Sequence, residues 1–272
     1  MPEVPRLSAS IAHKLTTESA LSGWAAHRLL GNLKQEASKS QIEGRMWHAA
    51  VLEDGHDIEV IDVADFRTAD AKELKAAVLA AGKIPVAQPV FDKLKPAAAR
   101  IREEMERRGL ILDGRIEQRF EWTEYTDDGQ PVECSGYIDQ TNGVEIKDIK
   151  SSKTPTSRDS AMNMICRSHS ILQDAAYRSA VATTDGSEVE DLDFIYVFFQ
   201  TREPHSITPL RMSGSFREIS HLRWRRAIHL WHDCISKGTD RKYWPDVTEG
   251  IEVMDAPGWM LSQETELEAI RD

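Results

Sequence analysis

Two short segments near the middle of the chain carry residue types that can bind a metal ion. Gly136-Tyr-Ile-Asp139 ends in a carboxylate, and Asp148-Ile-Lys150 follows after the turn-forming pair Asn142-Gly143. We therefore expect two neighbouring strands. Side chains two positions apart on a strand point to the same face, which directs Asp148 and Lys150 together toward Asp139. Two converging carboxylates can hold Mg²⁺, and an ammonium group beside them can stabilise the charge of a phosphodiester under attack.

The register of the second strand has an alternative. Glu145-Ile-Lys147 is another acid-x-Lys pair on the opposite face, and a slip of one residue would exchange the two faces. We prefer Asp148 and Lys150 because two apolar residues precede them on their face and Ser151-Ser152 begins a loop. An Asp-x-Lys pair is also typical of an ordinary solvated strand. A metal site is therefore indicated only if other residues of the chain can contribute to it.

Composition limits the class of protein. The chain has 272 residues, 40% of them hydrophobic and 29% charged, which is enough to bury a full core. No stretch approaches the roughly 20 apolar residues of a membrane span, and the N-terminus lacks a signal-peptide core. The three cysteines are far apart, so we expect them to be reduced and mostly buried, in a cytoplasmic protein. The net charge of −11 argues against a protein that coats nucleic acid indiscriminately.

Patterning predicts an α/β chain with a helical N-terminal part. A first helix is expected to begin at Ser8 or Ser10. Further helices are expected over Ala20–Leu30, Ser40–Glu53, Asp70–Ala81, Phe91–Gly109, Ala161–Ala182 and Ser215–Ser236. Expected strands cover Asp57–Val63, Arg115–Tyr125, Pro131–Asp139, Leu192–Gln200 and His205–Met212, with Gly82 and Pro85 ending a helix. The almost wholly apolar strand 192–200 suits a sheet covered on both faces. We predict one domain over 1–272, with a mainly helical part (1–110), an α/β core (111–236) and an irregular tail (237–272).

Other polar residues could complete a metal site. His48 lies in a predicted helix, where a histidine is more often a packed or surface residue than a ligand, although it could bind a metal or orient a carboxylate. Glu117 lies on a strand before Asp139, but periodicity does not separate it from Glu121 or Glu124. Gln173 and Tyr177, four apart, share one helical face, where packing is the ordinary role.

Taken in order, these segments resemble the PD-(D/E)XK nuclease superfamily, and most closely the RecE-type (exonuclease VIII) phage and prophage exonucleases. The segments that carry the resemblance are Leu7-Ser-Ala-Ser10, Gly44 with His48 and Leu52-Glu53, Glu117 ahead of Phe120-x-Trp122, Gly136-Tyr-Ile-Asp139, Asp148-Ile-Lys150-Ser-Ser, Gln173 with Tyr177, and Tyr243-Trp-Pro near Pro257-Gly-Trp259. Tyr137 departs from the family, which often has a basic side chain there. The absence of clustered cysteines separates the chain from iron–sulfur relatives.

The resemblance implies a restriction-endonuclease-like core, a mixed central sheet flanked by helices. It implies a Mg²⁺-dependent exonuclease, with Mn²⁺ as a substitute and one or two ions per site, that digests one strand of linear duplex DNA from its 5′ end. The 3′ tail would pass to a single-strand annealing protein in the cytoplasm of a bacterial host cell, and a cyclic trimer or tetramer is expected. The implied metal ligands are Asp139, Asp148, the Ile149 carbonyl and His48. The implied catalytic residues are Lys150, Glu117, Gln173 and Tyr177.

Two other functions remain open at this point. An endonuclease or repair nuclease of the same superfamily would cut DNA internally, without needing an end. A catalytically inactive relative would serve as a DNA-binding or scaffold module, but the presence of the expected acids and of Lys150 argues against it. A metabolic enzyme is disfavoured, because the sequence has no nucleotide-binding glycine motif and no catalytic triad.

Overall fold

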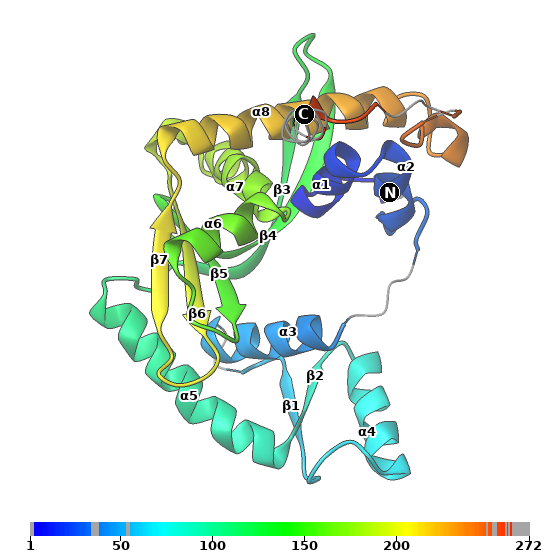
Figure 1. Cartoon of the computed structure of the whole chain (residues 1–272). Helices are drawn as coiled ribbons and strands as arrows, with labels where there is room; N and C mark the ends of the chain where they lie inside the picture. The colour runs from blue at the N-terminus through cyan, green and yellow to red at the C-terminus, as the bar shows by residue number, and fades with distance from the viewer. Residues whose placement is uncertain are drawn as a thin grey trace, which may run out of the picture.

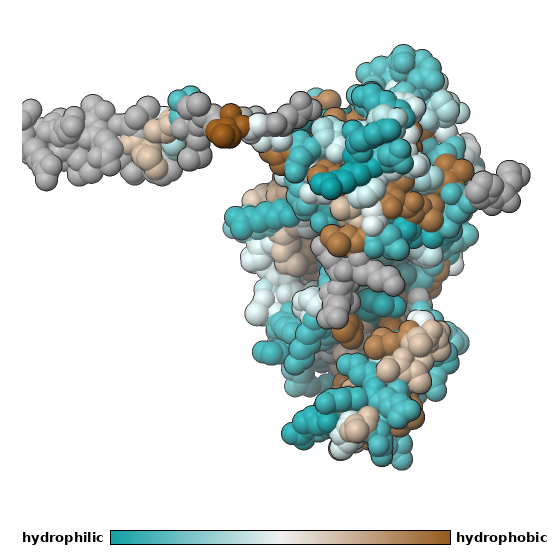
Figure 2. Space-filling view, turned by 90° about the vertical axis from the view of Figure 1, so that its right-hand side faces the viewer, coloured by the Kyte–Doolittle hydropathy of each residue, from teal (hydrophilic) through white to brown (hydrophobic). Residues whose placement is uncertain are grey.

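The computed structural model describes residues 3–33, 38–52, 55–248, 250–251, 255–258, 260 and 262. Glu53 and Trp259, which belong to two of the family-like segments, lie outside the described residues. No described helix is long and apolar enough to cross a membrane. The side of the molecule seen in Figure 2 is mostly hydrophilic, with smaller hydrophobic groups between the polar ones.

A five-stranded mixed sheet forms the centre of the molecule (Figure 1). Its strands are β3 (Arg115–Tyr125), β4 (Pro131–Thr141), β5 (Glu145–Ser152), β6 (Asp193–Gln200) and β7 (Ile207–Arg211), in that spatial order. The pairing of β5 with β6 is parallel and the other three pairings are antiparallel. The predicted α/β fold with a mixed central sheet flanked by helices is confirmed.

Strand β6 joins the two halves of the hydrophobic core. Phe194, Tyr196 and Phe198 point into one buried cluster, and Ile195, Val197 and Phe199 point into the other. Because successive side chains alternate across a sheet, a strand buried on both faces must be apolar throughout. The prediction that this strand is covered on both faces is confirmed.

One face of the sheet is covered by helices from both ends of the chain: α1 (Ala9–Thr17), α6 (Arg158–Cys166), α7 (Ser170–Asp185) and α8 (Gly214–Ile235). The single helix expected over 161–182 was wrong, because α6 and α7 are separate. Ser168 explains the break: its hydroxyl donates to the Met164 carbonyl at 2.8 Å and accepts from the Ser170 amide at 3.3 Å. Such local bonds compete with helix continuation.

The other face carries α3 (Lys39–Leu52), α5 (Gln88–Arg107) and a two-stranded parallel sheet of β1 (Ile58–Ile61) and β2 (Ile84–Ala87), with α4 (Ala69–Ala80) beside it. Strand β2 was not expected from the sequence, because Pro85 at its second position is typical of the end of a helix. The remaining helix α2 (Ala20–Ala26) is shorter than expected. Short 3₁₀ turns η1 (Val189–Asp191) and η2 (Arg241–Tyr243) complete the described elements.

Strands β4 and β5 pair only at their first contact and then separate. The ladder consists of Gln140 with Lys147 and Thr141 with Ile146. Farther along β4, the edge that β5 leaves is taken by Leu7, whose amide donates to the Glu133 carbonyl and whose carbonyl accepts from the Ser135 amide, both at 2.9 Å. This separation, called the strand fork below, begins directly at Asp139.

We expect Tyr196→Phe to lower the free energy of unfolding by about 1 kcal/mol, the usual net value of one buried hydrogen bond. The Tyr196 hydroxyl is fully buried and donates to the Ser170 carbonyl at 2.6 Å, which holds the start of α7 on the sheet. Urea denaturation measures the change. Tyr125→Phe is the control, because Tyr125 is 57% exposed and should tolerate the loss of its hydroxyl. An equal loss in both variants would contradict the assignment.

Candidate metal and catalytic site

Asp139 occupies the strand fork with its side chain in place of a backbone partner. Its Oδ2 atom accepts a hydrogen bond from the Ile149 amide at 2.6 Å, where a continued ladder would have used a carbonyl. The open fork also leaves the carboxylate accessible, with 14% of the side chain exposed. Burial by itself would raise the pKa of Asp139, but the charge of His48, their hydrogen bond and the charge of Lys150 hold it below its ordinary value.

Glu117 faces the same place from β3. Its φ angle is +48°, a conformation that non-glycine residues rarely adopt, and it is missing from a ladder that pairs both of its neighbours with β4. Backbone strain of this kind is often found at functional sites. Here it accompanies a carboxylate whose Oε1 atom lies 2.7 Å from Nδ1 of His48.

His48 on α3 connects the two carboxylates. Its Nε2 atom lies 3.0 Å from Oδ2 of Asp139, and one ligand atom from each of His48, Glu117 and Asp139 lies within 4.8 Å of the others. Burial by itself would lower the pKa of His48, but Asp139 and Glu117 raise it to about 10. The imidazolium therefore balances the two carboxylates when no other cation is present.

Asp148 and Lys150 form the second half of the site. The Lys150 Nζ atom lies 2.5 Å from Oδ2 of Asp148, whose side chain is 2% exposed. This contact is an ion pair without hydrogen-bond alignment, and neither oxygen of Asp148 accepts a hydrogen bond from the described residues. Burial raises the pKa of Asp148 to about 6, against the charge of Lys150 and with a further contribution from Asp139. A buried carboxylate with so few donors is under-compensated.

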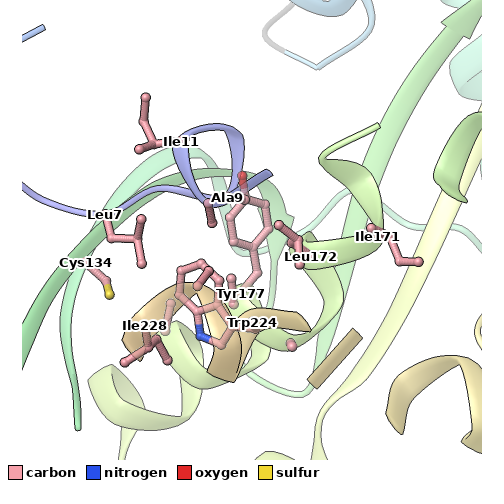
Figure 3. Packing of buried hydrophobic residues seen from close by; sticks show 14 of the residues in the cluster. Leu7, Ala9, Ile11, Cys134, Ile171, Leu172, Tyr177, Trp224 and Ile228 are labelled. Atoms are coloured by element: carbon pink, nitrogen blue, oxygen red, sulfur yellow. The ribbon is translucent and has the colours of Figure 1, made fainter. Parts of the chain in front are cut away.

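Helix α7 supplies Gln173 and Tyr177. Lys150 donates to the Gln173 side-chain carbonyl at 3.1 Å, and the Gln173 amide donates to the Tyr177 hydroxyl at 3.3 Å. In Figure 3 the Tyr177 ring lies between Ala9 and Leu172. A Cβ atom on Gly136 would come within 2.8 Å of the same ring, so the glycine on β4 lets α7 approach closely. Burial raises the pKa of Tyr177, which keeps its hydroxyl protonated.

The second acid-x-Lys pair has a different environment. Lys147 is 1% exposed, donates to the Gln140 side-chain carbonyl at 3.1 Å and lies 2.5 Å from Glu145. Glu145 also faces Arg211 at 3.5 Å. This pair therefore lies in a charge network at the closed end of the strand fork, whereas Asp148 and Lys150 face Asp139 and α7. No local sequence pattern identifies Gln140 as the partner of Lys147.

The donors at the fork fit a divalent cation. Carboxylate oxygens suit Mg²⁺ and imidazole also suits Mn²⁺, and a cation there would add positive charge near Asp148, whose oxygens accept no hydrogen bond from the described residues. His48, Glu117 and Asp139 could hold the ion between them, while the ligand role expected for Asp148 stays a prediction. Beside them, Lys150 contacts Asp148 and Gln173, and Gln173 contacts Tyr177. The Ile149 amide is engaged with Asp139, while the role expected for the Ile149 carbonyl stays a prediction.

One solved structure identifies a protein with a similar fold. The sequence matches no protein-family model and no curated protein sequence. The crystal structure of a "putative exonuclease" from Eubacterium rectale matches with a TM-score of 0.60 and 14% identity, covering 95% of this chain and 92% of that chain. Another structure, SSO0001, matches with a TM-score of 0.29 and 8% identity over 78% of this chain and 85% of that one, too low to establish a common fold. The chain therefore shares the fold of the Eubacterium rectale protein.

We expect Mg²⁺ or Mn²⁺ to raise the melting temperature of the protein, because a ligand that binds only the folded state stabilises it. At a concentration 100-fold above Kd, the stabilisation is about 2.7 kcal/mol, or roughly 5 °C for a chain of this size. Asp139→Asn should abolish the increase. Asp65→Asn is the control, because this exposed aspartate pairs only locally with Arg67. An undiminished shift in Asp139→Asn, measured by calorimetry, would rule out the fork as the cation site.

We expect replacement of each lysine in turn by methionine to show which acid-x-Lys pair is the active one. Lys150→Met should lower phosphodiester hydrolysis about a hundredfold or more, the usual cost of removing one group that stabilises developing charge. Lys147→Met should lower stability, because Lys147 is buried among polar partners, while the activity of the folded fraction stays within a few-fold of wild type. The measurement is the single-turnover rate, normalised to folded protein. The reverse result would place the active pair at Glu145 and Lys147.

Proposed function

We propose that the protein is a Mg²⁺-dependent exodeoxyribonuclease that hydrolyses phosphodiesters of linear double-stranded DNA. The observation that carries this proposal is the convergence of His48, Glu117 and Asp139 beside the under-compensated Asp148 and its partner Lys150. A bound divalent cation would supply positive charge to the phosphate and lower the pKa of a water. The fold shared with the "putative exonuclease" from Eubacterium rectale supports the same class of enzyme.

The chain's own residues have separable roles in this proposal. Lys150, beside a carboxylate, is best suited to act as an ammonium that stabilises charge on the phosphate and orients the attacking water. Gln173 accepts one hydrogen bond from that ammonium and so limits its rotamers. Tyr177 holds the Gln173 amide through its hydroxyl, so both α7 residues act by positioning. Glu117 remains available to a water or to the cation.

The finer properties of the proposal come from the RecE-type resemblance. They are digestion from the 5′ end, a 3′ single-stranded product for an annealing protein, and a cyclic trimer or tetramer around DNA. An exonuclease also differs from the alternative endonuclease in its requirement for an end. The same active site could serve an exonuclease or an endonuclease. Linear and covalently closed DNA substrates therefore distinguish the two activities.

We expect linear duplex DNA to be digested in Mg²⁺ and covalently closed duplex of the same sequence to remain intact. Duplexes labelled at either the 5′ or the 3′ end report polarity: a 5′ label should be released in the first small products, while a 3′ label stays in long fragments. Lys150→Met is the inactive control. Cleavage of closed circles would replace the proposal by an endonuclease, and absence of cleavage in both Mg²⁺ and Mn²⁺ would defeat it.

A further inference from the structure

We propose that the cavity beside Lys150, at the break between α6 and α7, is a nucleobase subsite that holds the base adjoining the phosphate under attack. The inference deepens the proposed function and rests on it. The cavity has a volume of about 370 Å³, within the usual range for small-ligand sites. Its wall includes Lys150, Met164, Ile165, Arg167, His169 and Phe198.

The chemistry of this wall suits a flat, largely apolar ligand. Phe198 and Ile165 are buried, while Met164 keeps 43% of its surface exposed on α6. A methionine sulfur makes favourable contacts with aromatic rings, and histidine is among the side chains on which splayed-out bases stack. His169 precedes α7 in an exposed position. None of these side chains is needed by the metal cluster itself.

A second cavity, of about 620 Å³, meets the first at His169 and has the opposite character. Ser8, Arg28, Arg119 and the Tyr177 ring are part of its wall. Both arginines already face acids, because Arg28 pairs with Glu3 and Arg119 lies 2.7 Å from Glu121. The apolar surface next to Lys150 therefore lies on the α6 side of His169, and polar groups collect on the other side.

Arg167 adds a cation to the rim of the apolar cavity. Its guanidinium has no acidic partner or hydrogen bond within the described part of the chain, and the residue is exposed. It is placed to meet the phosphate of a neighbouring nucleotide.

The position of Lys150 in the cavity wall indicates that the ligand of the cavity is a nucleotide. In a nucleotide, the base lies only a few bonds from the phosphate. A site for the base must therefore have, in its own wall, a group that also binds the phosphate. Lys150 meets this requirement, since it belongs both to the cavity wall and to the Asp148 pair. A purely apolar ligand would leave Arg167 without a partner, and a free phosphate would leave Met164 and Phe198 unused.

The test follows the methionine methyl groups by NMR in protein labelled with ¹³C-methyl methionine, with Mg²⁺ present. Thymidine 5′-monophosphate is the probe, because it contains a base and no phosphodiester to cleave, and 2-deoxyribose 5-phosphate is its base-free control. Met162 is the internal control: it lies on the same helix with 41% exposure but borders a different cavity, beside Phe216. Met162→Leu and Met164→Leu assign the two signals.

We expect the mononucleotide to shift the Met164 methyl signal through the ring current of the base, while Met162 stays in place and the base-free sugar phosphate leaves both unchanged. His169→Ala should weaken binding of the mononucleotide roughly tenfold, at the low end of the usual value of base stacking. An unmoved Met164 signal at millimolar mononucleotide, or equal shifts with both probes, would overturn the subsite.

A cleavage assay keeps this result separate from the proposed function. The wild-type enzyme should release a terminal abasic nucleotide about tenfold more slowly than a normal one, and Met164→Ala or His169→Ala should reduce this difference to within twofold. Met162→Ala should keep it. Normal digestion with no discrimination in the wild type would eliminate the base subsite alone, whereas absence of any Mg²⁺-dependent hydrolysis would eliminate the nuclease function.

Discussion

The separation of β4 from β5 is the constraint on which the rest of the site depends. The two strands stay paired through Gln140 and Lys147, and one residue later the Asp139 carboxylate replaces a carbonyl as the partner of the Ile149 amide. A continuous ladder would have used that amide and covered the carboxylate. Opening the ladder satisfies the backbone donor and leaves Asp139 near His48. The segment around Leu7 then occupies the free edge of β4, so the separation leaves no unpaired edge there.

Charge balance explains how so many ionisable groups can lie together at this fork. His48 compensates Asp139 and Glu117, and Lys150 compensates Asp148, so each carboxylate has one cationic neighbour. The compensation is incomplete at Asp148, whose oxygens lack hydrogen-bond donors and whose pKa burial raises to about 6. Lys147 is handled differently, because Gln140 and Glu145 surround it in the interior. Two similar acid-x-Lys pairs on one strand thus have unequal environments.

Several elements followed from local pattern, and the misses have identifiable causes. Strand β6 was predictable because burial on both faces requires an uninterrupted apolar run. Strand β2 was not predicted, because Pro85 is a strong signal for the end of a helix and its pairing with β1 depends on a distant segment. The break between α6 and α7 depends on bonds of the Ser168 hydroxyl, which compete with an otherwise helical sequence.

The sequence by itself determined which chemical groups are available: a strand ending in Asp139, Asp148 and Lys150 on one face of the next strand, and Gln173 and Tyr177 on one face of a helix, because these relations depend only on local periodicity. It could not choose Glu117 over Glu121 or Glu124, or determine the neighbours of His48. The tertiary structure decided both, since the positive φ of Glu117 and the packing of α3 across the fork arise from contacts between distant segments. Asp148 was likewise distinguished from Glu145 only by which of them faces α7 and Asp139, a property of how the strands separate.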